Sequence, residues 1–167
     1  FGDYDVDGAA SSALLVDWIG AVSGKPTVYI PDRIDEGYGP NVEAMSRLAQ
    51  NHQLIICVDC GTLSHGPIEA AIAAGAKVMI ADHHLAGETL PVCDAVVNPN
   101  RHDDDSGMGA LCAAGVVFLL LIAANRLRRE AGEMAPNLIS MLDLVALATV
   151  ADVAQLTGLN RALVRQG

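Results

Sequence analysis

The sequence predicts an α/β fold: a parallel β-sheet of about five strands flanked by helices and followed by a helical segment. Three observations support this prediction. Short apolar runs alternate along the chain with segments of helical periodicity, which is the pattern of strand–helix–strand units. The apolar runs are continuous, as in strands that are buried on both faces of a parallel sheet. After residue 98 the alternation stops, and two longer helical patterns follow.

The expected strands are short and rich in β-branched and aliphatic residues. Most of them end in a polar residue or a proline, where a turn begins. We expect a first strand truncated just before Gly2, and four more strands at residues 27–31, 54–59, 77–82 and 95–97.

Helical periodicity appears between these strands and after them. Leu15, Ile19 and Val22 would share one face of a helix, and Ile68 and Ile72 one face of another. A polar loop follows the last strand, and beyond it we expect two long helices, at residues 111–131 and 138–153.

Composition and charge limit the classes of function. The longest apolar run, residues 110–124, is too short to span a bilayer, and no signal peptide is visible, so we expect a cytoplasmic protein that does not bind membranes. The net charge of −10 argues against a surface that coats nucleic acid. It does not exclude a nuclease, because bound divalent cations would offset the charge at the site itself.

The four cysteines do not predict a disulfide framework or a zinc site. Cys57 and Cys60 lie along one expected strand, where their Cα atoms would be roughly 10 Å apart, too far for a bridge. No second C-x-x-C pair is present. We therefore expect buried thiols in a reducing compartment.

Acidic residues and histidines follow three of the expected strands at their carboxyl ends. In an open parallel sheet these ends share one edge, where ligands bind. Crowded carboxylates repel one another unless cations lie among them. Mixed oxygen and nitrogen ligands suit a divalent cation such as Mn²⁺. The residues are Asp3, Asp5 and Asp7, then Asp59, then Asp82, His83 and His84.

Two further acids, Asp152 and Asp143, lie in the second half of the chain, and the first acidic motif also resembles part of a calcium loop. Asp152 lies in a nearly all-apolar helical pattern, where it is either a helix-end carboxylate bonded to backbone or a metal ligand. Asp143 is nine residues earlier and half a turn out of phase, so we do not expect it to be a ligand. The alternating aspartates of residues 3–7 are shared with calcium loops, but no glutamate stands at the twelfth position.

Four motifs in order resemble those of the DHH phosphoesterase family. They are GDYDVDG at residues 2–8, VDCG around Asp59, DHH at residues 82–84 and TVADV around Asp152. Two further segments, residues 31–39 and the last 17 residues, are similar to the bacterial members that degrade single-stranded DNA. The resemblance covers nearly the whole chain.

The resemblance implies an enzyme: a metal-dependent, single-stranded-DNA-specific 5′-to-3′ exonuclease of DNA recombination and repair. It implies two divalent cations, Mn²⁺ or else Mg²⁺. Asp5 would serve one cation, assisted by Asp3, and Asp7 the other. Asp59 would bridge both, while His83 and Asp152 complete the second site.

The same resemblance implies roles around the metals. His84 would contact the scissile phosphate, and Asp82 would orient a neighbouring histidine. Arg33 lies in a loop on the same rim, and beside metals and phosphates we expect it to bind the DNA backbone. Tyr38 would either stack on a base or pack against the protein. Expected partners are single-stranded DNA and, by family analogy, a single-strand-binding protein or a helicase.

We expect residues 1–167 to be a fragment that holds the catalytic domain, with a metal-binding α/β part at about 1–100 and a helical part at about 110–167 that leads to a second domain outside this chain. Two other functions stay open. One is a DHH phosphodiesterase acting on oligoribonucleotides, cyclic dinucleotides or pyrophosphate. The other is an inactive DHH-like scaffold of the replication machinery, although such proteins have typically lost metal ligands that are all present here.

Overall fold

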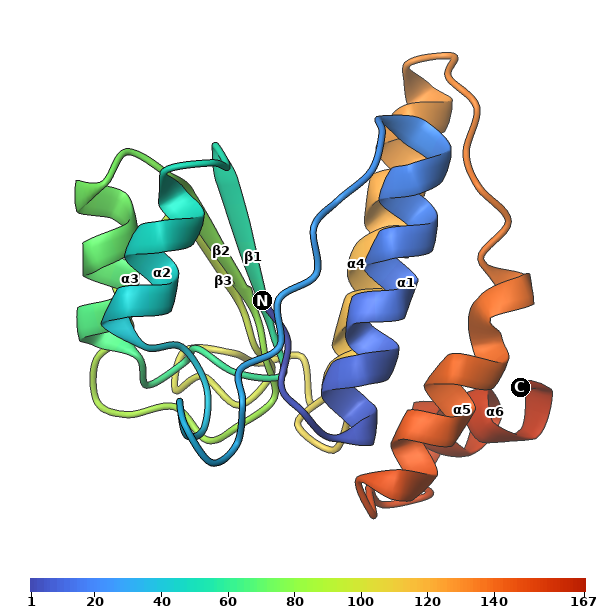
Figure 1. Cartoon of the computed structure of the whole chain (residues 1–167). Helices are drawn as coiled ribbons and strands as arrows, with labels where there is room; N and C mark the ends of the chain where they lie inside the picture. The colour runs from blue at the N-terminus through green and yellow to red at the C-terminus, as the bar shows by residue number, and fades with distance from the viewer.

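The computed structural model describes residues 1–167 and has a parallel sheet between layers of helices (Figure 1). The sheet contains β1 (Leu54–Val58), β2 (Lys77–Ala81) and β3 (Ala95–Val97), in the order β1-β2-β3. Strands β1 and β2 pair from Leu54 opposite Lys77 to Val58 opposite Ala81.

Helices cover both faces of this sheet. Helices α2 (Val42–Ala49) and α3 (His65–Ala73) lie on one face, and α1 (Val6–Val22) and α4 (Ala113–Glu130) lie on the other (Figure 1). A 3-10 turn, η1, leads into α5, which packs on the outer side of α1 and α4, and α6 packs against α5. Their bounds are Ile139–Met141, Leu142–Ala151 and Gly158–Gln166.

Alternate residues of each central strand serve two hydrophobic cores. Ile55 and Cys57 of β1 point to the core shared with α2 and α3, whereas Val58 belongs to the core shared with α1, α4 and α5. Ile80 and Ala81 of β2 divide in the same way. Because both faces are buried, the strands are continuously apolar, as predicted.

The sheet has fewer strands than the five predicted. Residues 27–31 form no strand, and the stretch at Gly2 makes only a single parallel bridge, to Val58. The backbone N–H of Gly2 donates to the carbonyl of Tyr29 at 3.0 Å, so Phe1 and Gly2 lie between β1 and residues 27–31.

The remaining elements agree with the prediction. The helix expected at residues 111–131 is α4, and the one expected at 138–153 is η1 followed by α5. All four cysteines are free, and Cys57 and Cys60 are buried. No helix is long and apolar enough to cross a membrane.

The carboxyl ends of the strands lie together at the lower edge of the view in Figure 1. The amino-terminal ends of α1 and α4 and the carboxyl-terminal end of α5 reach the same edge. This edge is therefore the place where loops from the sheet meet the helical layer.

Candidate metal centre

The first acidic motif forms the turn into α1. Asp5 is the N-cap residue, and its carboxylate accepts a hydrogen bond from the N–H of Gly8 at 2.9 Å. Asp3 is buried and accepts from the N–H of Tyr4 at 2.8 Å. A Cβ atom on Gly8 would lie 2.5 Å from the carbonyl oxygen of Asp3, so only glycine allows this tight turn.

Asp7 joins α1 to α4. It is buried in the first turn of α1, and its two oxygens accept from the N–H groups of Ala113 at 2.6 Å and Ala114 at 2.7 Å. These are the first residues of α4, where the helix dipole favours an anion. Burial raises the pKa of Asp7, although the two N–H donors oppose the rise. The hydrogen bonds fix the carboxylate in place beside the sheet edge.

Asp59, directly after β1, is a buried carboxylate that has no hydrogen-bond partner on either oxygen. Its backbone is left-handed, with φ of 60°, a conformation that aspartate tolerates better than most residues. Burial raises its pKa to about 7, and the charges of Asp7 and Asp5 add to the effect. The imidazole of His83 lies within ion-pair distance, with Nε2 3.3 Å from one oxygen, but a buried carboxylate without a hydrogen bond is still costly. Its two free oxygens therefore fit a bound cation.

The Asp82-His83-His84 turn after β2 is organised by Asp82. One oxygen of this buried carboxylate accepts from the backbone N–H groups of His83 at 2.8 Å and His84 at 3.2 Å, and from Nδ1 of His84 at 2.7 Å. The other oxygen accepts from the N–H of Thr62 at 3.1 Å. Burial alone would raise the pKa of Asp82, but these hydrogen bonds hold it below its usual range. Both carboxylate oxygens of Asp82 are therefore hydrogen-bonded within the protein.

His83 points toward three other carboxylates. Its Nε2 lies 3.3 Å from Asp59 and 3.8 Å from Asp7, and its Nδ1 lies 3.8 Å from Asp152. Burial lowers the pKa of His83, but these three acids outweigh burial and raise it to about 9. The imidazole thus lies at the centre of the acidic cluster.

Asp152 reaches this cluster from the end of α5, where it is the C-cap residue. Its side chain is 26% exposed, and its carboxylate accepts no hydrogen bond from backbone. The helix-end position of Asp152 is confirmed, and its role as a metal ligand stays a prediction.

The donor atoms form two groups that meet at Asp59 and His83. Within each group the donor atoms lie within 4.8 Å of one another. One group is Asp3, Asp5 and Asp59, and the other is Asp7, His83 and Asp152. A third combination, Asp59, His83 and His84, overlaps both. Carboxylate oxygens with one or two imidazole nitrogens are a donor set suited to Mn²⁺.

Two asparagines complete the site, and sequence analysis assigned them no role. Asn98 is buried after β3, and its side-chain N–H₂ donates to Thr62 Oγ1 and to the carbonyl of His84, both at 2.9 Å. Asn100 donates to the carbonyl of His83 at 2.5 Å. Their position after a strand end, the same signal that identified the acids, predicts a place on this rim.

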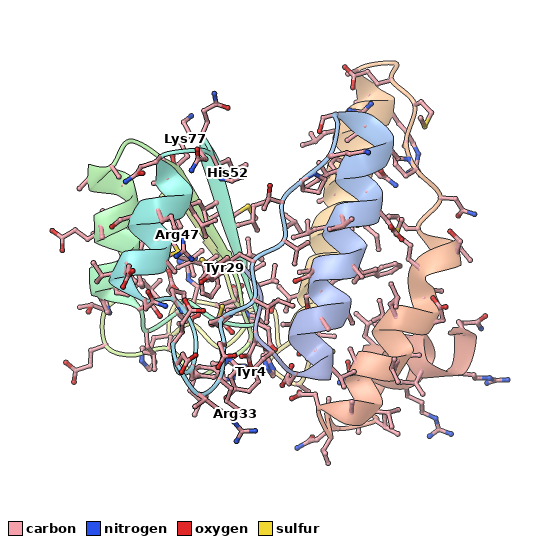
Figure 2. The ribbon with its side chains drawn as sticks, in the orientation of Figure 1. Tyr4, Tyr29, Arg33, Arg47, His52 and Lys77 are labelled. Carbon is pink, nitrogen blue, oxygen red and sulfur yellow. The ribbon has the colours of Figure 1, made fainter.

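Arg33 and Tyr38 also lie on the rim, but neither belongs to the groups of potential metal ligands. The Arg33 guanidinium carbon is 5.4 Å from the centroid of the Tyr4 ring, and Figure 2 shows both residues below the carboxyl ends of the strands. Tyr38 is 55% exposed, and its hydroxyl lies 3.2 Å from Nε2 of His84 and 3.3 Å from the carbonyl oxygen of Asp59. Tyr38 is therefore not a packed core residue.

Other acidic residues, among them Asp143, which the sequence did not predict as a ligand, lie in solvent outside the cluster. Asp143 is exposed in the first turn of α5, and the acidic loop at residues 102–105 is exposed, with Asp103 paired to Arg101 at 2.6 Å. Neither belongs to the groups of potential ligands.

Comparison with known proteins gives a consistent result. The model of the DHH family, N-terminal domain, matches residues 1–149. The single-stranded-DNA-specific exonuclease RecJ of Dickeya dadantii (strain 3937) is 42% identical, over 99% of this chain and 30% of that protein. The RecJ of Thermus thermophilus is 37% identical, over 99% of this chain and 24% of that protein. The chain thus spans less than a third of the length of these curated relatives.

Solved structures give the same fold. A crystal structure of exonuclease RecJ bound to manganese matches with a TM-score of 0.85 and 37% identity, over 99% of this chain and 41% of that chain. The Thermus thermophilus RecJ in complex with Mn²⁺ matches with a TM-score of 0.78 and 34% identity, over 99% of this chain and 23% of that chain.

Proposed function

We propose that this chain, which belongs to the DHH family, is the metal-binding catalytic part of an exonuclease that degrades single-stranded DNA from its 5′ end. The observation that carries the proposal is the buried Asp59 carboxylate, whose oxygens have no hydrogen bonds and lie where two groups of ligand atoms meet. Relatives at up to 42% identity are named as single-stranded-DNA-specific exonucleases, which supports the substrate class.

The donor groups fit two divalent cations, and we propose Mn²⁺, with Mg²⁺ as the alternative. Asp5 and Asp3 would hold one ion, and Asp7, His83 and Asp152 the other, with Asp59 shared between them. When bound, such a pair activates a water and neutralises charge on the leaving oxygen of a phosphodiester.

The protein's own side chains would place the substrate over this centre. The side chain of His84 is 45% exposed at the rim, so it is available to a phosphate oxygen. Asp82 holds Nδ1 of His84 and would therefore orient the ring rather than touch DNA. Arg33, exposed over the face of Tyr4, would bind a backbone phosphate with its guanidinium.

The acidic character of the chain limits how it would hold DNA. With ten basic and twenty acidic residues, long-range attraction for a polyanion is weak, so contacts at the site itself must provide the binding energy. We propose that the reaction takes place in the cytoplasm, which suits the four unpaired cysteines. A single-strand-binding protein or a helicase is the partner that we propose by family analogy.

The test compares substrates with the full-length protein. In Mn²⁺ we expect 5′-labelled single-stranded DNA to release mononucleotide label at once, whereas 3′-labelled DNA should shorten progressively and duplex DNA should resist. Oligoribonucleotides, cyclic dinucleotides and pyrophosphate serve as competing substrates. Faster hydrolysis of any of these than of single-stranded DNA would favour another DHH phosphodiesterase. Absence of all hydrolysis in a protein that binds Mn²⁺ would favour the scaffold function.

A further inference from the structure

Tyr38 lies between the two strand ends that build the site. It belongs to the loop before α2, at residues 31–40, and its ring meets two aromatic neighbours edge to face. The ring centroid is 6.2 Å from that of Tyr4 and 6.0 Å from that of His84. The hydroxyl, not a ring face, is the part that reaches the strand ends.

The imidazole of His84 is held at both nitrogens. Nδ1 contacts a carboxylate oxygen of Asp82 at 2.7 Å, and Nε2 contacts the hydroxyl of Tyr38 at 3.2 Å. Two partners on opposite sides of the ring fix its plane as well as its direction. Without the hydroxyl, the ring would be fixed at Nδ1 alone and would be free to tilt about that contact.

The Tyr38 hydroxyl can satisfy both of its contacts together. A phenol has one proton to donate and lone pairs to accept. It can donate to the carbonyl of Asp59 at 3.3 Å while accepting from Nε2, or it can donate to Nε2. The carbonyl of Asp59 belongs to a residue with φ of 60°. The hydroxyl can therefore hydrogen-bond to Nε2 whether or not that nitrogen carries a proton.

We propose that Tyr38 is a positioning residue: its hydroxyl holds the Nε2 edge of the His84 imidazole at the rim, where the scissile phosphate would share Nε2 with that hydroxyl. The inference rests on the proposed function, because it assumes that His84 contacts that phosphate. This role belongs to the hydroxyl and is distinct from the two roles that the sequence suggested for the ring, base stacking and packing. The ring is 55% exposed and meets Tyr4 and His84 edge to face.

The kinetic test separates the hydroxyl from the ring in the full-length protein. Tyr38→Phe removes only the hydroxyl, and Tyr38→Leu removes the ring as well. If the hydroxyl positions His84, Tyr38→Phe should lower kcat on single-stranded DNA by about tenfold, the loss of one hydrogen bond, with KM within about twofold. A normal kcat in Tyr38→Phe, with a raised KM only in Tyr38→Leu, would overturn the proposal in favour of base stacking.

A spectroscopic test does not depend on nuclease activity. In full-length protein with ¹⁵N-labelled histidine and diamagnetic Mg²⁺, the Nε2 resonance of His84, assigned by its loss in His84→Gln, should shift in Tyr38→Phe. Tyr4→Phe is the matched control, since its hydroxyl makes no contact with His84, and should leave that resonance in place. An unchanged resonance in Tyr38→Phe would overturn the proposal. If wild-type protein failed to cleave DNA, the proposed function would fail while this measurement still decided the role of Tyr38.

Discussion

Asp59 combines burial, a left-handed backbone and two carboxylate oxygens that accept no hydrogen bond. These features oppose stability in the absence of a cation, because a buried charge without a hydrogen bond is costly and the imidazole of His83, 3.3 Å away, offsets only part of that cost. They favour tight binding once a cation is present, since no hydrogen bond within the protein must first be broken. The side chain is thus arranged for a ligand rather than for the fold.

Asp59→Asn should therefore change metal binding and stability in opposite directions. Without metal, we expect the variant to unfold at the same temperature as wild type or higher, because an amide carries no buried charge. Mn²⁺ should raise the unfolding temperature of wild type but not of the variant, and calorimetry should detect no tight ion in it. Asp143→Asn, at an exposed aspartate outside the cluster, is the control and should bind Mn²⁺ like wild type. Two tightly bound ions in Asp59→Asn would contradict the shared-ligand role.

Val153, next to Asp152, has a left-handed backbone with φ of 56° and is 85% exposed. A β-branched residue is strained there, in the position after a helix end that glycine usually occupies. Val153→Gly should stabilise the metal-free protein by about 1 kcal/mol, measured by urea denaturation. Val150→Gly, at an exposed valine within α5, should instead lose roughly 0.5 kcal/mol. Destabilisation in both variants would show that Val153 makes packing contacts that outweigh its strain.

At the scale of elements, the loop at residues 31–40 is a turn that side-chain hydrogen bonds hold together and that presents Arg33. The side chain of Asp32 accepts from the N–H groups of Ile34 at 2.8 Å and Asp35 at 3.0 Å, and Glu36 accepts from the N–H of Asp32 at 2.9 Å. Glu36 also binds the Tyr29 hydroxyl. Arg33 therefore reaches the rim from an ordered loop.

Arg33→Ala in the full-length protein should raise KM for single-stranded DNA by about 10- to 100-fold, the loss of a charged hydrogen bond to phosphate. The dependence of KM on salt should become less steep, since one phosphate contact is lost. Mn²⁺ binding should not change. Arg126→Ala removes an exposed arginine of α4 that pairs with Glu130, and should behave like wild type. Equal effects of the two substitutions would indicate a general charge effect instead of a phosphate contact.

The side chain of Asn98, which follows β3, holds the turn that carries both histidines in place. Asn98 donates to the carbonyl of His84 and to Thr62, and its own side-chain carbonyl accepts from the N–H of Asn100 at 2.8 Å. Removing this side chain leaves several buried polar groups without partners.

Asn98→Ala should therefore cost about 1–3 kcal/mol of unfolding free energy in chemical denaturation. Because it loosens the turn behind His83, it should also weaken Mn²⁺ binding by about tenfold in calorimetric titration. Asn51→Ala, at an exposed asparagine that donates only to the carbonyl of Arg47, should stay within about 0.5 kcal/mol of wild type. Normal Mn²⁺ affinity in a destabilised Asn98→Ala would show that the Asn98 side chain supports folding but not metal binding.

The sequence predicted those parts of the site that depend on strand ends and missed those that depend on side-chain direction. Acids after apolar strands located the rim, because parallel strands end at one edge. The same rule applied to Asn98 but was not used, since asparagine carries no charge to suggest a metal. The contact of Tyr38 with His84 joins positions 46 residues apart and has no local signal. Residues 27–31 were predicted to form a strand because they are largely apolar and β-branched, but a strand also needs a neighbouring strand with which to pair.

At the scale of the whole molecule, the cluster joins parts that are far apart in sequence. Asp7 belongs to α1 and is held by the start of α4, His83 follows β2, and Asp152 ends α5. A cation bound among them would connect the sheet to α1, α4 and α5. Metal binding should therefore stabilise the entire fold rather than one loop, since an ion that binds only the folded state shifts the unfolding equilibrium.

Proton binding gives the metal-free molecule a characteristic dependence on pH. The folded-state pKa of Asp59 is raised from 3.8 to about 7, and that of His83 from 6.5 to about 9. Burial also raises the pKa values of Asp3 and Asp7, and Asp82 raises that of His84. Each raised group binds more protons in the folded than in the unfolded state, so its contribution is full below the unfolded pKa and is lost as pH rises through the folded pKa. The pKa of Asp82 is lowered, so its contribution is present above 3.8 and constant from pH 5 to 9.

We therefore expect the metal-free protein to lose stability steadily from pH 5 to pH 9, measured as the unfolding temperature in a chelating buffer. With saturating Mn²⁺ the trend should reverse over the lower part of this range, because the ion binds deprotonated ligands and competes with protons for them. Asp59→Asn should flatten the metal-free dependence around neutral pH, since it removes the group that titrates near 7. An unfolding temperature that rises with pH in the chelating buffer would contradict the assignment, because it would mean that the folded cluster binds fewer protons than the unfolded chain.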